Sequence, residues 1–267
     1  VIICRAGAMT ISELAVMKKA CLMIPSPNVV DNHQYKNAKV LVDAGAGKTV
    51  DLERLIAERP DLVPFLAYAR KVNPNAVIAI GHSQATPMEI RALGKYRPTL
   101  MTHTFDATGR QPVLIGTRGY GPDEYALQTP EMYCELISDS CGIHVHPEMQ
   151  RLLLQSKGVD KVVLITDCTV AVGENPPALA HITDLNFDHN SDLCGSRLTL
   201  DQACKNIMAA TNCGIAQAFL MAATNPAKVV GMYDEIGSIE PGKAADLVFV
   251  TDRFQVQRVL VAGKVVR

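Results

Sequence analysis

The chain has 267 residues, of which 48% are hydrophobic and 20% are charged, and its formal net charge is −1. A near-neutral charge does not predict a nucleic-acid surface or a strongly charged membrane surface, and no apolar run approaches the roughly 20 residues needed to cross a bilayer. The composition is that of a globular protein with a sizeable core.

The eight cysteines include no Cys-x-x-Cys pair and no zinc-ligand spacing, which favours reduced thiols and a cytoplasmic location. The chain starts at Val1, inside the apolar pattern "VIIC", without an initiator methionine and without the layout of a secretory signal. We therefore expect that the natural beginning of the polypeptide has been lost.

Residues 1–50 alternate strand and helix patterns. "VII" and "CLMIP" are expected as buried parallel strands, and "TISELAVMKKA" as the helix between them. Thr10 and Glu13 form a capping box at the helix start, and the preceding loop "RAGAM" could receive an anion there.

The segment "VDAGAGKTV", residues 42–50, resembles a phosphate-binding loop but has Val42 where the first glycine is required. The preceding residues predict a helix that ends at Gly45, followed by a linker. No phosphate site is expected here.

After this linker, four polar residues follow apolar strand patterns: His82 after "NAVIAIG", His103 after "TLMT", His144 after "CELISDSCGI" and Asp167 after "KVVLIT". Helix signals follow them after loops, and helix starts are expected at three places: Thr86 with Glu89, Thr129-Pro130, and Thr199 with Gln202. In a (β/α)₈ barrel, residues at the carboxyl ends of the strands converge on one face.

Two histidines and an aspartate on one such face suit metal-assisted hydrolysis. Neutral imidazole binds divalent metals such as zinc, and a nearby carboxylate can move the proton of an activated water. A single histidine at a strand end is more often a hydrogen-bonded structural residue. His146 is expected to be a surface residue beside a helix, and His181 and His189 to be loop residues.

"RAGAMTISEL", "IPSPNVVDNHQYKNA" and "LVDAGA" closely resemble the C-terminal nucleotide-sugar domain of the lipid-II-forming N-acetylglucosaminyltransferase family. The resemblance implies that Gly7 and Ala8 lie near the donor diphosphate, Glu13 near the ribose and Gln34 near the sugar. Glu13 is equally well explained as a helix cap. The acceptor domain of that family has no counterpart in this chain.

"AIGHSQAT", "MTHTFDATGRQP", "GIHVHPEM", "LITDCTVAVG" and "ATNPAKVVGMYDEIGSIEPGKAADLVFV" follow one another in the order of the N-acetylglucosamine-6-phosphate deacetylase family of amidohydrolases. The resemblance runs from about residue 55 to the end.

This resemblance implies that His82 and His103 are metal ligands and that Asp167 activates water and then protonates the departing amine. It further implies that the substrate is bound by His144, Asp106, Ala107 and Arg110. Arg110 matches an arginine that grips phosphate in a neighbouring subunit, which implies a homodimer; the alternative is a solvated loop charge.

The sequence also departs from the family pattern. A glutamate metal ligand and a further histidine belong to barrel strands that this chain lacks, Asp106 stands where an asparagine is usual, and Cys141 where an aspartate is usual. The tail alternates with strand period, has a turn at Ala262-Gly263 and lacks the partner strands of the family's small β-sandwich, so exposed edges are expected.

The predicted fold is α/β. A half Rossmann-like βαβα segment (1–50) precedes a partial (β/α)₈ amidohydrolase-type barrel (51–236) and the strands of a small sandwich (237–267). The predicted function is zinc-dependent deacetylation of N-acetylglucosamine 6-phosphate. The alternatives are a UDP-N-acetylglucosamine-dependent transferase fragment or binding module, and a catalytically inactive remnant, arising by natural fusion, truncation or an assembly error.

Overall fold

The computed structural model describes residues 2–4, 21–23, 47–49, 63–109, 119–170, 173–189 and 191–267. The first three of these ranges are described as backbone strands only. The predicted residues Gly7, Ala8, Glu13, Gln34 and Arg110 lie outside the described residues.

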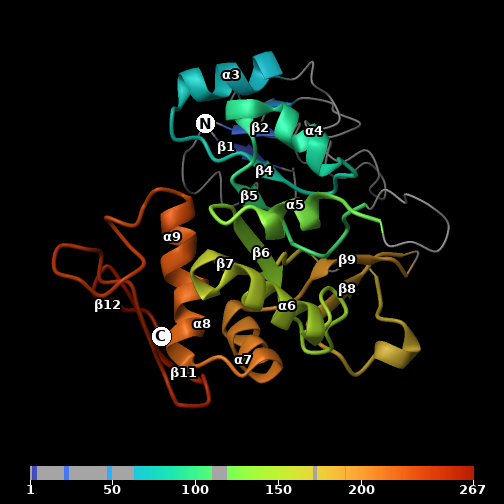
Figure 1. Cartoon of the computed structure of the whole chain (residues 1–267). Helices are drawn as coiled ribbons and strands as arrows, with labels where there is room; N and C mark the ends of the chain where they lie inside the picture. Colours follow the sequence, from blue (N-terminus) through green and yellow to red (C-terminus); the bar gives the residue numbers. More distant parts are fainter. Residues whose placement is uncertain are drawn as a thin grey trace.

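A parallel four-stranded sheet forms the centre of the fold (Figure 1). Its strands neighbour one another in chain order: β4 (Ala79–Ile80), β5 (Leu100–Met101), β6 (Tyr133–Ile137) and β7 (Val162–Ile165). A parallel bridge between Cys168 and Ser196 continues the arrangement beyond β7. All strands therefore end at the same edge, as in part of a (β/α)₈ barrel.

Helices alternate with the strands along the chain (Figure 1). They are α3 (Val63–Val72), α4 (Pro87–Ala92), α5 (Pro122–Gln128), α6 (Pro147–Lys157), α7 (Leu200–Thr211), and α8 (Ile215–Phe219), which continues through a π-helical turn η7 (Leu220–Thr224) into α9 (Asn225–Val229). This alternation confirms the predicted α/β class with a partial barrel.

The core lies between the sheet and these helices. In β6, Cys134 and Leu136 are fully buried within it, while Glu135 between them lines a cavity on the other face. The same alternation occurs in β7, where Leu164 belongs to the core. Because both faces of these strands are covered, their sequences contain apolar runs, which is the signal that predicted them.

The three predicted helix starts have different outcomes. Thr86 caps α4 with the full capping box, since its Oγ1 accepts from the Glu89 N–H and the Glu89 carboxylate accepts from the Thr86 N–H at 2.7 Å. Thr199 precedes α7 but makes no side-chain cap hydrogen bond. The helix predicted at Thr129 is wrong: Thr129 follows the last turn of α5, and its hydroxyl donates to the Tyr125 carbonyl.

Three short strands are described in the N-terminal region. β1 (Ile2–Cys4), β2 (Cys21–Met23) and β3 (Gly47–Thr49) form a parallel sheet in that order. The first two confirm predicted strands. The predicted linker is wrong at residues 47–49, because Gly47–Thr49 pairs with β2. A phosphate-binding loop would place Gly-Lys-Thr at a helix start, so its position in a strand agrees with rejection of that motif.

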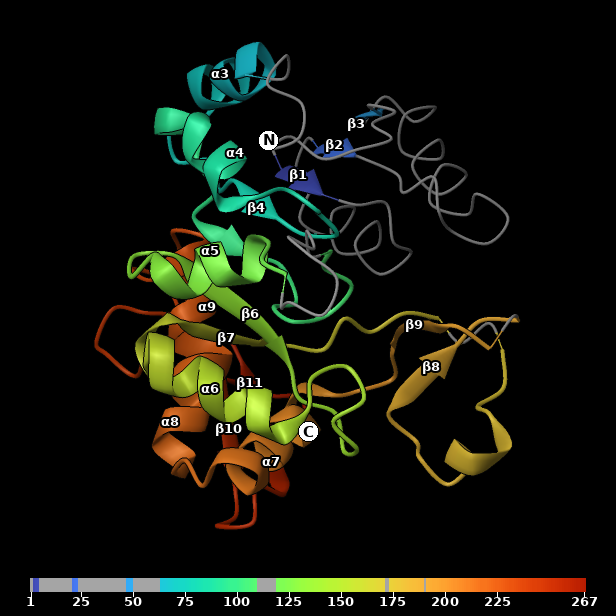
Figure 2. The same ribbon diagram turned by 45° about the vertical axis from the view of Figure 1, so that its right-hand side comes forward.

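Two antiparallel units complete the fold. β8 (Leu185–Phe187) and β9 (Leu193–Ser196) form a hairpin that projects from the side of the molecule (Figure 2). At the C-terminus, β10 (Leu247–Val250), β11 (Val256–Val261) and β12 (Lys264–Val265) form a separate sheet. The predicted turn at Ala262-Gly263 joins β11 to β12, with positive φ at both residues, which suits this tight hairpin.

The C-terminal sheet has apolar residues open to solvent, in line with the exposed edges that the sequence predicted. They are Val248, Phe249, Val261 and Val265, each about half exposed or more. Of the helices in the described residues, none has both the length and the apolar character required to cross a membrane.

Candidate active site

Three predicted site residues occupy equivalent positions at the carboxyl edge of the sheet. His82, His103 and Asp167 each lie two positions beyond the last residue of β4, β5 and β7, and each has a positive φ, of 51°, 32° and 46°. Such a conformation costs a non-glycine residue about 1–3 kcal/mol and recurs at functional sites. The strand ends therefore turn in the same unusual way wherever a candidate residue follows.

The structure brings His82 and His103 together. Their ring centroids are 4.6 Å apart with an interplanar angle of 85°, and His103 is only 3% exposed, whereas His82 is open to solvent. The His103 Nδ1 lies 3.0 Å from the backbone carbonyl of Asp106. Because a carbonyl only accepts hydrogen bonds, Nδ1 carries the proton, and the Nε2 lone pair is left for a metal ion.

The pair fits a divalent cation as part of a coordination shell. Two imidazoles, one with its tautomer fixed by a backbone carbonyl, are suitable zinc ligands. Within the described residues, however, no group of three or more His, Cys, Asp or Glu side chains is arranged to hold a metal. The histidine pair could supply two ligands, and the described residues do not complete the set.

Asp106 and Asp167 lie in the same electrostatic environment as the histidines. Burial raises the pKa of Asp106, the charges of His103 and His144 lower it, and the Asp167 carboxylate raises it again. The Asp106 carboxyl therefore responds to the charges of His103, His144 and Asp167. Ala107, also predicted to bind substrate, is exposed on the same loop, with a φ of 49°.

His144 lies on a loop, whereas the sequence predicted that it directly follows a strand. It does not follow β6 directly, since the strand ends at Ile137 and a loop of several residues intervenes. The His144 ring is buried, with Nδ1 3.1 Å from Asp139 Oδ2 and Nε2 3.2 Å from the Gly195 carbonyl oxygen. The loop, and not the strand end, positions the imidazole.

His146, His181 and His189 are not part of the site. His146 is exposed at the start of α6, where its Nδ1 accepts from the Glu148 N–H, as expected for a residue beside a helix. His181 and His189 are exposed loop residues, as predicted.

Asp123 holds the loop after β5 and was missed in the sequence. From the first turn of α5, its buried carboxylate accepts from the Phe105 N–H at 3.0 Å and from the Thr108 hydroxyl at 2.5 Å. Between these contacts the loop has positive φ at Phe105 and Ala107. In the sequence, "GPDE" looks like an ordinary helix start, so only the folded structure reveals this contact.

Replacing Asp123 by asparagine is expected to lower the free energy of unfolding by about 1.5–3 kcal/mol, because a buried charge-assisted acceptor is lost. Urea denaturation at neutral pH measures the change. Asp201→Asn is the matched control, since Asp201 occupies the same position in α7 but is partly exposed. An equal loss in both variants would attribute the effect to the helix dipole and contradict the role of Asp123 in the loop.

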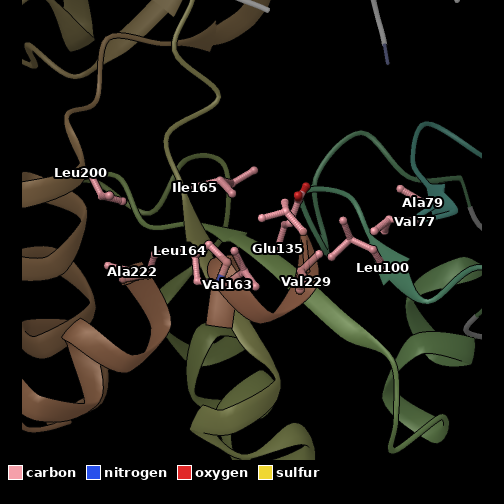
Figure 3. A pocket seen from close by; sticks show the side chains of 12 residues that line it. Val77, Ala79, Leu100, Glu135, Val163, Leu164, Ile165, Leu200, Ala222 and Val229 are labelled. Carbon is pink, nitrogen blue, oxygen red and sulfur yellow. The ribbon is translucent and has the colours of Figure 1, made fainter. Parts of the chain in front are cut away.

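Glu135 is a second residue that the sequence did not single out. It projects from β6 into a cavity of about 360 Å³ that is otherwise lined mainly by aliphatic side chains (Figure 3). Burial raises the pKa of Glu135 to about 7. The charge of Asp167 also raises it, whereas a hydrogen bond from the His103 backbone lowers it. A buried carboxyl group with a raised pKa thus lies next to the candidate site.

Comparisons with known proteins give the family. The Amidohydrolase family model matches residues 62–266, and the model of the Glycosyltransferase family 28 C-terminal domain matches residues 1–59. The N-acetylglucosamine-6-phosphate deacetylase of Haemophilus influenzae is 26% identical over 241 residues, covering 81% of this chain and 60% of the relative. The N-acetylgalactosamine-6-phosphate deacetylase of Escherichia coli O157:H7 is 28% identical, covering 79% of this chain and 56% of the relative.

A solved structure has the same fold. The N-acetyl-D-glucosamine-6-phosphate deacetylase of Mycobacterium smegmatis aligns with a TM-score of 0.70 at 21% identity, covering 100% of this chain and 77% of that one. The chain spans little more than half the length of the curated relatives, namely 60% and 56% of the two named above. Since the family model accounts for most of its residues, and the parallel sheet has the corresponding architecture, the chain belongs to the Amidohydrolase family.

Proposed function

We propose that the chain is a metal-dependent hydrolase that removes the acetyl group from an N-acetylated hexosamine 6-phosphate, with N-acetylglucosamine 6-phosphate as the substrate. The observation that carries the proposal is the meeting of His82 and His103 at the sheet edge where Asp167 also lies. Relatives named as deacetylases of N-acetylglucosamine and N-acetylgalactosamine 6-phosphates support this substrate class.

In this proposal His82 and His103 would hold a divalent cation, zinc, which would supply Lewis acidity for the hydrolysis. Asp167 takes the proton of the attacking water and then delivers it to the nitrogen of the departing amine, because one positioned carboxylate can act first as base and then as acid. Water oxygen bonds to the acetyl carbon, the amide C–N bond breaks, and acetate and the free amine result.

The other predicted residues bind the substrate. His144, Asp106 and Ala107 surround the sugar, and Arg110 grips the 6-phosphate with two hydrogen bonds, in the site of a neighbouring subunit of a homodimer. The free thiols of the described cysteines from Cys134 to Cys213 support a cytoplasmic location. We assign residues 1–50, 51–236 and 237–267 to the transferase-like segment, the barrel and the C-terminal strands.

Acetate release from N-acetylglucosamine 6-phosphate, measured with purified chain and added zinc, tests the proposal. We expect release that a chelator abolishes and that is weaker with unphosphorylated N-acetylglucosamine. No release under any of these conditions would refute the deacetylase activity of this chain. Stoichiometric bound zinc in the purified protein would argue against the inactive-remnant alternative.

The family 28 match to residues 1–59 favours one second candidate, a module that binds UDP-N-acetylglucosamine through Gly7, Ala8, Glu13 and Gln34. Titration calorimetry with this nucleotide sugar tests it. Binding that Glu13→Gln weakens would support the module, and the absence of heat would leave it without support.

A further inference from the structure

The loop between β6 and α6 wraps around the carboxylate of Asp139. Asp139 Oδ1 accepts from the backbone N–H groups of Cys141 at 2.9 Å and Ile143 at 3.0 Å, and Oδ2 accepts from that of His144 at 2.9 Å. Asp139 is 4% exposed. This carboxylate therefore determines the path of the loop that carries His144.

The same carboxylate also contacts the His144 ring. Oδ2 of Asp139 lies 3.1 Å from Nδ1, and the opposite ring nitrogen, Nε2, lies 3.2 Å from the Gly195 carbonyl oxygen. Both partners are hydrogen-bond acceptors. A neutral imidazole has only one N–H, so either tautomer would direct a lone pair at an oxygen, whereas the doubly protonated ring donates to both.

We propose that Asp139 is a positioning residue that holds His144 as an imidazolium ion, with its ring fixed between the loop after β6 and strand β9. This places a positive charge beside the candidate active site at neutral pH.

The charges around the ring are consistent with this protonation state. His144 faces Asp139 on its own loop, Asp106 from the loop after β5, and the Gly195 carbonyl from β9. Burial lowers the pKa of His144, but the hydrogen bond to Asp139 and the charges of Asp106 and Asp139 prevail and raise it. Burial likewise opposes ionisation of Asp139, yet hydrogen bonds from His144 and the loop backbone lower its pKa to about 2.

The consequence for catalysis rests on the proposed function. An imidazolium next to Asp106 favours an electron-rich oxygen of the substrate, which a neutral histidine would bind less strongly. Of the two ring hydrogen bonds, the one from Nε2 to Gly195 is longer and is not made to a carboxylate, so a substrate oxygen can take its place without disturbing the contact with Asp139.

Nitrogen-15 NMR of the full chain with labelled histidine tests the protonation state directly. His144 is assigned from the signal lost in His144→Gln. We expect both ring nitrogens to carry protons at pH 7 and the imidazolium to persist above the ordinary histidine pKa, being lost only as the pH rises through the raised value. A neutral ring at pH 7 would overturn the proposal, without any need for an Asp139 variant to fold.

The Asp139→Asn variant then tests the cause. We expect the pKa of His144 to fall by about one pH unit or more, because burial remains while the carboxylate is lost. Asp184→Asn is the matched control, since Asp184 accepts hydrogen bonds from the Ser140 N–H and hydroxyl on the same loop. A fall of the same size in both variants, or none in Asp139→Asn, would overturn the role of Asp139. Failure of acetate release with His144 shown to be an imidazolium would instead refute the proposed function.

Discussion

Replacing Asp167 by asparagine is expected to lower kcat for acetate release by about 10²–10⁴-fold, the range in which a positioned acid–base group contributes. The amide cannot take the proton of water or return it to the amine. Asparagine tolerates a positive φ as well as aspartate does, so the turn after β7, with its φ of 46°, is retained. Because substrate binding does not require the carboxylate, KM is expected to change much less than kcat. Steady-state kinetics with N-acetylglucosamine 6-phosphate measure both.

The matched control for this variant is Asp160→Asn. Asp160 is exposed, and it lies just before the other end of the same strand, in the 3-10 turn η5 (Val159–Lys161). We expect this variant to keep wild-type kcat. If Asp167→Asn also kept it, with circular dichroism showing an unchanged fold, Asp167 would have no acid–base role.

The parallel sheet and three of the candidate residues could be predicted because the signals are local. A strand that is buried on both faces has a run of apolar residues in its sequence. His82, His103 and Asp167 are the polar residues just beyond such runs. Their closeness then follows from parallel pairing, which aligns the carboxyl ends of neighbouring strands. No long-range information was needed beyond the assumption that the strands are consecutive in the sheet.

Other features depend on contacts between distant segments, which no local pattern reports. Asp123 contacts a loop 15 to 18 residues earlier in the chain, and the Gly195 carbonyl meets a ring 51 residues away. Glu135 was overlooked for the opposite reason. It is one carboxylate in an apolar strand, and its pKa is raised mainly because the fold buries it.

The secondary structure predicted from the sequence was wrong in two places, for similar reasons. Thr129-Pro130 has the local form of a helix start, but the Thr129 hydroxyl instead donates to the last turn of α5. Gly47–Thr49 reads as a linker because of its glycine, yet β2 provides a parallel partner along its whole length. In both places a partner from an earlier segment overrides the local preference.

Replacing His103 by asparagine is expected to weaken zinc binding by at least about 100-fold, since even the loss of a group that merely orients a ligand costs 10- to 100-fold in metal affinity. The His103 ring is buried at 3% exposure, and its Nδ1 is held by the Asp106 carbonyl, so its Nε2 is oriented before a metal arrives. His82 is exposed, so its replacement is expected to weaken zinc binding through loss of a ligand and to change the free energy of unfolding less than replacement of His103 does. Calorimetric titration with zinc measures the change in metal affinity, and urea denaturation measures the change in stability.

His181→Asn provides the control for metal bound at exposed imidazoles, since His181 is exposed in the segment after the 3-10 turn η6 (Pro177–Leu179). It should leave zinc affinity unchanged. Zinc affinity equal to that of the wild type in both His82→Asn and His103→Asn would show that the two rings do not share a metal. The 4.6 Å separation of their centroids would then be only an edge-to-face packing contact, and the hydrolytic proposal would lose its main structural support.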